Sequence, residues 1–184
     1  MDLISNHKTL LEQWRKRMNL VGPGPIGEHY ADAEACLAVV PEPTGEWADL
    51  GSGAGFPGIV FAARYPEVSL DFVDSRRKRC VFVDQILMTT DLADHAPRRV
   101  LCQRVESLPD ASYDGIISRA FAPPEVVLDH ADRLLRPGGE LVLLLQDRAP
   151  TPEDPRFTEV ASHTYTLPGR EPRRSVRLVR APAQ

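Results

Sequence analysis

Cysteine is scarce in this chain, and long apolar runs are absent. The three cysteines, Cys36, Cys80 and Cys102, include no Cys-x-x-Cys pair. We therefore expect neither a disulfide framework nor a metal site, and a reducing cytoplasm is the default expectation for localisation. No apolar run approaches the roughly 20 residues that a membrane-spanning helix needs. The first residues show no basic stretch followed by an apolar one, so we expect no secretory signal and no membrane partner.

An excess of charge of one sign is also missing. The 184 residues carry a formal net charge of -4, and 26% of them are charged. A general nucleic-acid coat protein would be far more basic, although net charge does not exclude a local basic face. The length and the apolar fraction of 42% fit one soluble globular domain. We expect this domain to be a monomer.

Prolines and glycines divide the chain into short predicted elements. Helices are predicted over residues 5–17 and 29–39. Predicted strands and helices then follow in the order strand 47–50, helix 56–64, strand 69–73, helix 76–88, strand 100–102, strand 113–118, helix 125–135 and strand 141–145. The last two predicted strands, over 157–165 and 175–179, have no helix between them.

This order of elements predicts an α/β fold. Strands that alternate with helices are typical of a parallel sheet covered on both faces, and the final pair is expected to form an antiparallel hairpin at the sheet edge. We expect a short N-terminal helical cap over residues 1–45 and a Rossmann-like core over residues 46–184, the two forming one compact unit.

The most informative motif is the stretch Asp49-Leu50-Gly51-Ser52-Gly53-Ala54-Gly55-Phe56-Pro57-Gly58. A predicted strand ends in an acid, and a glycine-rich turn leads into a helix. Such a turn lets a ligand approach the backbone closely, with helix N–H groups pointing at it. Asp74 ends the next predicted strand, where a carboxylate accepts hydrogen bonds from ribose hydroxyls in doubly wound nucleotide folds.

Two nucleotide ligands compete for this motif. Gly53-x-Gly55-x-x-Gly58 also fits the dinucleotide pattern. However, Asp49 would repel an anionic pyrophosphate and would attract the ammonium of a methionyl group. The expected C-terminal hairpin suits a methyltransferase sheet, and nothing resembles a second domain for hydride transfer. These features favour S-adenosyl-L-methionine over NAD, while a glycine turn without any ligand is the less favoured third reading.

Further motifs carry a resemblance to a known family. The chain resembles the bacterial methyltransferases that make N7-methylguanosine in 16S ribosomal RNA, the family of glucose-inhibited division protein B. The matching pieces are Trp14, Asn19-Leu20, His29-x-x-Asp32, the glycine motif up to Ile59, Val73-Asp74-Ser75 with Lys78-Arg79, Arg104-Val105-Glu106, and Ser118-Arg119-Ala120-Phe121-Ala122.

The resemblance implies a class I methyltransferase fold and a cofactor site. That site would contain Gly51, Phe56, Val105, Glu106 and Arg119, with Asp74 holding the ribose. To these we add the residues of the loop itself and the one that follows Asp74, namely Asp49, Ser52, Gly53, Gly55 and Ser75.

We assign the catalytic, positioning roles to Arg119, His29 and Asp32. The alternatives stay open at this point. Arg119 could instead pair with Asp114 or Glu106, and His29 and Asp32 could be a hydrogen-bonded pair that packs the cap on the sheet. Phe56 and Phe121 could stack on a base or belong to the core. All three cysteines are expected in apolar settings.

Some positions depart from the family pattern. Only 13 residues precede Trp14, Val21 stands where Thr or Ser is usual, and Gln146-Asp147 replaces a segment that usually contains lysine. These departures lie on the expected acceptor side and leave the cofactor motif intact.

Basic residues form three local groups. They are Arg15-Lys16-Arg17, Arg76-Arg77-Lys78-Arg79, and the C-terminal set Arg170, Arg173, Arg174, Arg177 and Arg180. Such groups can bind an RNA backbone, or they can be solvated surface and protected sheet edge.

We therefore expect methyl transfer from S-adenosyl-L-methionine to N7 of a guanosine in 16S ribosomal RNA, with that RNA or the small ribosomal subunit as partner. Guanine N7 carries a lone pair and no proton, so the reaction needs positioning and no general base. The alternatives are a methyltransferase of the same fold that acts on another RNA or a small molecule, and a non-catalytic RNA-binding module with a relic pocket.

Overall fold

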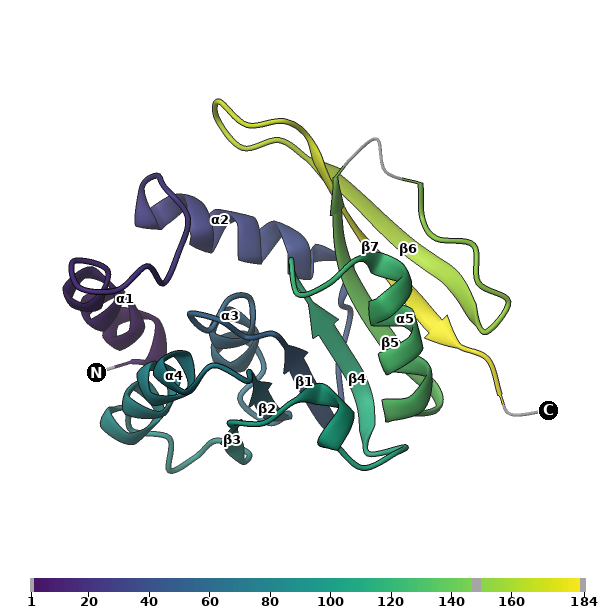
Figure 1. Cartoon of the computed structure of the whole chain (residues 1–184), viewed down its shortest axis with the longest axis horizontal. Coiled ribbons are helices and arrows are strands. Elements are labelled where there is room, and N and C mark those ends of the chain that lie inside the picture. The colour runs from purple at the N-terminus through teal and green to yellow at the C-terminus, as the bar shows by residue number, and fades with distance from the viewer. Residues whose placement is uncertain (1, 147–149, 183–184) are drawn as a thin grey trace.

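One seven-stranded sheet organises the chain (Figure 1). The computed structural model describes residues 2–146 and 150–182. The strands are β1 (Glu46–Leu50), β2 (Ser69–Val73), β3 (Arg98–Leu101), β4 (Tyr113–Ser118), β5 (Leu135–Gln146), β6 (Phe157–Tyr165) and β7 (Arg173–Arg180). The α-helices are α1 (Leu3–Trp14), α2 (Ile26–Cys36), α3 (Gly58–Arg64), α4 (Arg77–Thr89) and α5 (Pro124–Leu134), with 3-10 turns at Leu37–Val39 and Val105–Ser107.

The sheet order is β3-β2-β1-β4-β5-β7-β6, and the first five strands in this order are parallel. Strand β1 has β2 on one side and β4 on the other, so the connections after β1 and β4 diverge here. In open α/β sheets, ligands bind beyond the carboxyl ends of the strands at such a switch point. The predicted alternation and the parallel sheet are confirmed.

The C-terminal hairpin is also confirmed. Strand β7 pairs antiparallel with both β5 and β6 and lies between them. Strand β5 begins at Leu135 and includes Arg136 to Gly139, a segment that we expected to be a loop. Arg136 accounts for this difference, because its guanidinium binds Asp114 at 2.6 Å and Glu46 at 2.7 Å and so holds the segment beside β4 and β1.

The two N-terminal helices pack on the sheet and its helices. His7 of α1 is fully buried and joins three elements: its Nε2 donates to the carbonyl of Ala54 (2.8 Å), and its Nδ1 accepts from the hydroxyl of Tyr30 (2.7 Å). Leu11 of α1 shares one hydrophobic cluster with Phe61 of α3. The core therefore continues across residue 45, and the division into cap and core stays a prediction. No helix within the described residues has the length and apolar character to cross a bilayer.

Candidate active site

The glycine loop after β1 has a shape that requires glycine. Gly51, Gly53 and Gly55 have φ angles of +71°, +57° and +89°. A Cβ at Gly51 would lie 2.6 Å from the ring of Phe121, so a side chain is excluded by space as well as by backbone conformation. The N–H groups of Gly51 and Ser52 both donate to the carbonyl of Val73, at 2.9 and 3.0 Å, which ties the loop to the end of β2.

Asp49 is a buried carboxylate of which only one oxygen accepts a hydrogen bond within the described residues. Its Oδ2 accepts from the N–H of Gly58 at 3.0 Å, while its buried Oδ1 has no hydrogen-bond partner among residues 2–146 and 150–182. Burial raises the pKa of Asp49 to about 7, and the Gly58 hydrogen bond and the Arg119 charge oppose this rise. Because a buried acceptor is costly without a donor, Oδ1 is suited to a cationic group of a ligand.

Asp74 joins the end of β2 to the glycine loop. Its Oδ2 accepts from the N–H of Gly53 at 3.0 Å and lies 3.5 Å from the Arg79 guanidinium, while its Oδ1 accepts from the N–H of Arg76 at 2.8 Å. A carboxylate oxygen can accept two hydrogen bonds, so Oδ1 retains capacity for a hydroxyl. Ser75, the next residue, is exposed.

A cavity of about 650 Å³ opens beside this loop, between α2 with the loop before it and the ends of β4 and β5. This volume falls in the range of small-molecule sites. Seven of the residues that we singled out line it: Gly51, Ser52, Gly53, Phe56, His29, Asp32 and Arg119. Six do not line it: Asp49, Gly55, Asp74, Ser75, Val105 and Glu106.

Val105 and Glu106 have other contacts. The Val105 carbonyl accepts from Arg133 at 2.8 Å, and its side chain is buried. Glu106 is exposed and lies 3.4 Å from Arg104. A backbone hydrogen bond lowers the pKa of Glu106, and the hydrogen bond from Arg104 lowers it further. The carboxylate of Glu106 therefore lies outside the cavity.

Asp32 is the central acceptor of the cavity wall. Its Oδ2 accepts from Arg119 at 2.8 Å, and its Oδ1 accepts from Arg173 at 2.7 Å and from the hydroxyl of Tyr165 at 2.9 Å. The alternative in which Arg119 pairs with Asp114 or Glu106 is therefore wrong. Asp32 links α2 to the end of β4 and to the C-terminal hairpin, and only 4% of its side chain is exposed.

His29 is not bonded to Asp32. No hydrogen bond joins the two residues in the described part of the chain, and His29 Nε2 is buried without a partner there. Burial lowers the pKa of His29, and the positive charge of Arg119 lowers it further. The alternative of a hydrogen-bonded packing pair is therefore wrong, and His29 lines the cavity together with Arg119.

Aromatic packing fixes Phe56. Its ring lies 4.9 Å from the rings of His7 and Tyr30, and the Arg119 guanidinium lies 5.2 Å from its centroid. Only 3% of Phe56 is exposed, so it is a core residue with one edge at the cavity.

The cysteines offer no nucleophile to this cavity, because none of them lines it. Cys36 and Cys80 are buried, and burial raises the pKa of each thiol to about 12. Cys102 is exposed, so the expectation of an apolar setting is wrong for this residue.

His7 and Tyr165 escaped the sequence reasoning, and Arg173 was singled out only as one of the C-terminal basic residues. His7 holds the loop at Ala54, whereas Tyr165 and Arg173 reach Asp32 from the hairpin. Contacts between positions so distant in the chain leave no local pattern. The one signal in the sequence was His7 itself, a histidine within the amphipathic helix predicted over residues 5–17.

Comparisons with known proteins agree with this geometry. The family model GidB, described as rRNA small subunit methyltransferase G, matches residues 1–158. Ribosomal RNA small subunit methyltransferase G of Rhodospirillum centenum is 35% identical over 76% of this chain and 64% of its own length. The protein of the same name from Pseudomonas aeruginosa (strain UCBPP-PA14) is 32% identical over 95% of this chain and 83% of its own length. The chain thus spans less than two thirds of the first relative.

Solved structures show the fold. A SAM-dependent methyltransferase from Methanosarcina mazei superposes with a TM-score of 0.61 at 15% identity, over 89% of this chain and 100% of that chain. A predicted O-methyltransferase from Agrobacterium tumefaciens gives a TM-score of 0.62 at 22% identity, over 80% and 79% of the two chains. The protein therefore has the fold of SAM-dependent methyltransferases, and it belongs to the family of rRNA small subunit methyltransferase G.

Proposed function

We propose that the protein transfers a methyl group from S-adenosyl-L-methionine to N7 of a guanosine in 16S ribosomal RNA. The names of its relatives support the RNA class, and the family resemblance supports N7. The observation that carries the proposal is the free oxygen of buried Asp49 at the start of a glycine loop that borders a cavity.

The residues present fit the cofactor. Asp49 would hold the ammonium of the methionyl group, and the open backbone around Gly53 would lie against its chain, since a Cβ there would meet nothing closer than 3.7 Å. Asp74 would bind the ribose through Oδ1. When bound, the cofactor supplies an electrophilic methyl group on a positively charged sulfur.

The protein's own task is positioning. Guanine N7 carries no proton, so no side chain has to remove one. Arg119 has five N–H donors, and the structure uses NH1 on Asp32, which leaves further donors on the cavity side for the cofactor or the base. Because Asp32 and Phe56 fix this guanidinium, it can orient a reactant without large rearrangement.

One of the departures from the family pattern, Val21, lies at this cavity. Val21 and Gly22 line it, whereas Asp147 lies outside the described residues. A cytoplasmic location, a monomeric state and the small ribosomal subunit as partner belong to the same proposal.

Methylation of deproteinised 16S ribosomal RNA tests the proposal. The protein is incubated with the RNA and isotopically labelled S-adenosylmethionine, and the digested nucleosides are separated by mass spectrometry. We expect label in N7-methylguanosine and none with Arg119→Ala. Label in another nucleoside, or none in any although the cofactor binds, would favour a methyltransferase with a different substrate. Absence of cofactor binding would favour the relic pocket.

A further inference from the structure

Two basic runs of the sequence meet at one place on the surface. Helices α1 and α4 pack side by side and antiparallel (Figure 1). Asn6 near the start of α1 donates to the hydroxyl of Thr90 just after α4, and Trp14 at the end of α1 lies 5.3 Å from the ring of Phe82. The segment 15–17 therefore lies beside the first turn of α4, which carries the second run.

A groove of about 920 Å³ lies between these two segments. Its apolar surface comes from Trp14, Met18 and Val81. Val81 is 47% exposed although it is aliphatic, and Trp14 and Met18 are partly exposed. The groove thus presents an aromatic ring and two apolar side chains to solvent.

Four cations surround this apolar surface: Lys16, Arg17, Arg77 and Lys78. All four are exposed, and none forms an ion pair within residues 2–146 and 150–182. The first turn of α4 contains no acid, so its cations stand at the positive end of the helix dipole. This arrangement is unfavourable in isolation and becomes favourable when an anion is bound.

Residues close together in the chain line the groove and the candidate active site. Lys78 precedes Arg79, which lines the 650 Å³ cavity, and Met18 lies two residues before Leu20, which lines it too. A chain held in the groove could therefore extend to the cavity.

We propose that this groove binds an unpaired segment of RNA, with a base against Trp14 and the phosphates on the four cations. Aromatic surfaces bordered by cations are the usual combination in sites for single-stranded nucleic acid. The proposal deepens the proposed function, because it gives the RNA substrate a second contact outside the cavity. An anionic membrane would also meet the charges, but a concave apolar surface suits an inserted base better than a flat bilayer.

The test uses Arg77→Gln/Lys78→Gln with a matched control, Lys8→Gln/Arg64→Gln, which removes two exposed cations elsewhere. The probe is a mixed-sequence single-stranded oligoribonucleotide, titrated at several salt concentrations. We expect the groove variant to bind it about tenfold more weakly at about 0.1 M salt and to lower the salt slope by about 1.4, or about 0.7 for each phosphate contact. The control should keep the affinity and slope of the wild type.

Tryptophan fluorescence adds a direct readout of contact. Trp47 is buried, so quenching by the oligonucleotide is expected from Trp14 and should vanish in Trp14→Phe, which retains a ring against Phe82. Equal affinity and slope in the groove and control variants would overturn the proposal. So would a Trp14 signal that responds to phosphatidylglycerol vesicles and not to RNA.

The two proposals fail separately. If the wild type forms no N7-methylguanosine while RNA still quenches Trp14 and the groove variant binds weakly, only the proposed methyl transfer is rejected. If N7-methylguanosine forms and the groove variant binds RNA like its control, only the groove is rejected.

Discussion

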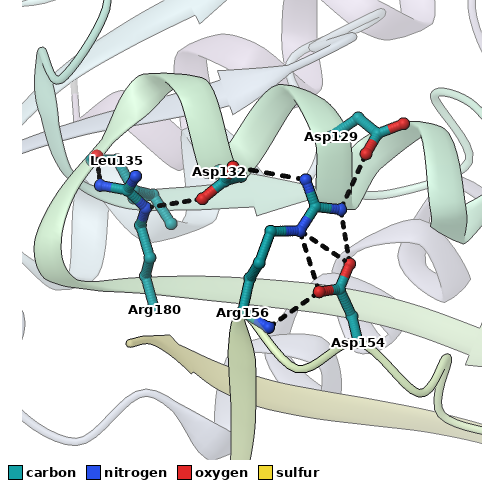
Figure 2. A network of polar contacts seen from close by, with 6 residues as sticks. All are labelled: Asp129, Asp132, Leu135, Asp154, Arg156 and Arg180. Atoms are coloured by element: carbon teal, nitrogen blue, oxygen red, sulfur yellow. Dashed lines mark hydrogen bonds and ion pairs between the residues drawn. The ribbon is translucent and has the colours of Figure 1, made fainter. Parts of the chain in front are cut away.

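Positive side chains are paired with carboxylates in one region of the protein and unpaired in another, among the described residues. In the C-terminal hairpin region, arginines are matched with carboxylates from other elements: Arg170 with Glu28, Arg173 with Asp32, Arg177 with Glu140, and Arg180 with Asp132. Figure 2 shows the densest part, where Arg156 contacts Asp129, Asp132 and Asp154, and Arg180 contacts Asp132 and the carbonyl of Leu135. In the groove of α1 and α4, the four cations have no such partners among the described residues.

This difference distinguishes cations that hold elements of the fold together from cations that are available to an anionic ligand. Both regions look alike in the sequence, because each is a local excess of Arg and Lys. Acids brought from distant segments neutralise the hairpin, whereas no described acid reaches the groove. This contrast favours the four groove cations over the C-terminal set as RNA contacts, and RNA binding by any of the three basic groups stays a prediction.

The largest expected effect is the loss of Asp32. In Asp32→Ala, two arginines and the hydroxyl of Tyr165 lose their shared acceptor in a mostly buried place. Removing one side of a buried charge cluster costs about 3 kcal/mol, and a chain of this size should lose roughly 10 °C in melting temperature. Circular dichroism melts measure this shift.

The control for Asp32 is Glu28→Gln, which breaks the more exposed pair with Arg170. An exposed pair contributes about 1 kcal/mol or less. Equal melting temperatures for Asp32→Ala and Glu28→Gln would contradict the role of Asp32 as the acceptor that holds the hairpin to the cap.

A second prediction concerns pH, where His7 and Asp49 act with opposite signs. Burial lowers the pKa of His7 to about 4. Between about pH 6.5 and 4 the unfolded chain is therefore protonated at His7 while the native state is not, and the free energy of unfolding falls as the pH drops through this range. Burial raises the pKa of Asp49 to about 7, so the native state holds a proton that the unfolded chain has released, and stability falls as pH rises from about 4 to 7.

The variant Asp49→Asn removes only the second effect. Its free energy of unfolding should rise more steeply with pH between about 4.5 and 6.5 than that of the wild type, by up to about 1.4 kcal/mol per pH unit. Urea unfolding curves at several pH values give this slope. Parallel pH profiles for the two proteins would show that Asp49 is already ionised in the fold.

The smallest effect is expected from Asp129→Asn/Asp132→Asn. Asp129 is exposed and Asp132 is partly exposed, so their loss should cost about 1 kcal/mol. Arg180 then has no carboxylate partner and Arg156 keeps only Asp154, so the added positive charge should raise affinity for the oligoribonucleotide about two- to threefold. Titration of the variant beside the wild type measures this gain. A gain as large as the loss seen in the groove variant would remove the distinction between the two regions.

Much of the fold could be predicted from local patterns in the sequence. Strand β2 and strand β4 were predicted with the bounds observed, because each is a short segment rich in β-branched and aromatic residues with polar residues close by on both sides. The glycine-rich turn after β1 was likewise predicted from the motif, and the positive φ angles of Gly51, Gly53 and Gly55 are its observed form. These features depend on neighbours in the chain.

The rest depended on partners that a sequence pattern does not reveal. The pairing of Arg119 with Asp32 joins positions 87 residues apart, and the contact of Tyr165 with Asp32 spans 133. The early start of β5 follows from Arg136 reaching Glu46, 90 residues away. Whether Val105 and Glu106 border a bound cofactor stays a prediction, since they do not line the cavity.

The most direct measurement is calorimetric titration of S-adenosylmethionine into the wild type, Asp49→Asn and Asp71→Asn. Asp71 is an equally buried strand carboxylate, but Arg99 and Tyr113 satisfy it away from the cavity. If Asp49 holds the cofactor's ammonium, Asp49→Asn should bind roughly thirtyfold more weakly, the equivalent of about 2 kcal/mol for a charged hydrogen bond, and Asp71→Asn should bind like the wild type. Equal affinity in all three proteins would contradict the account.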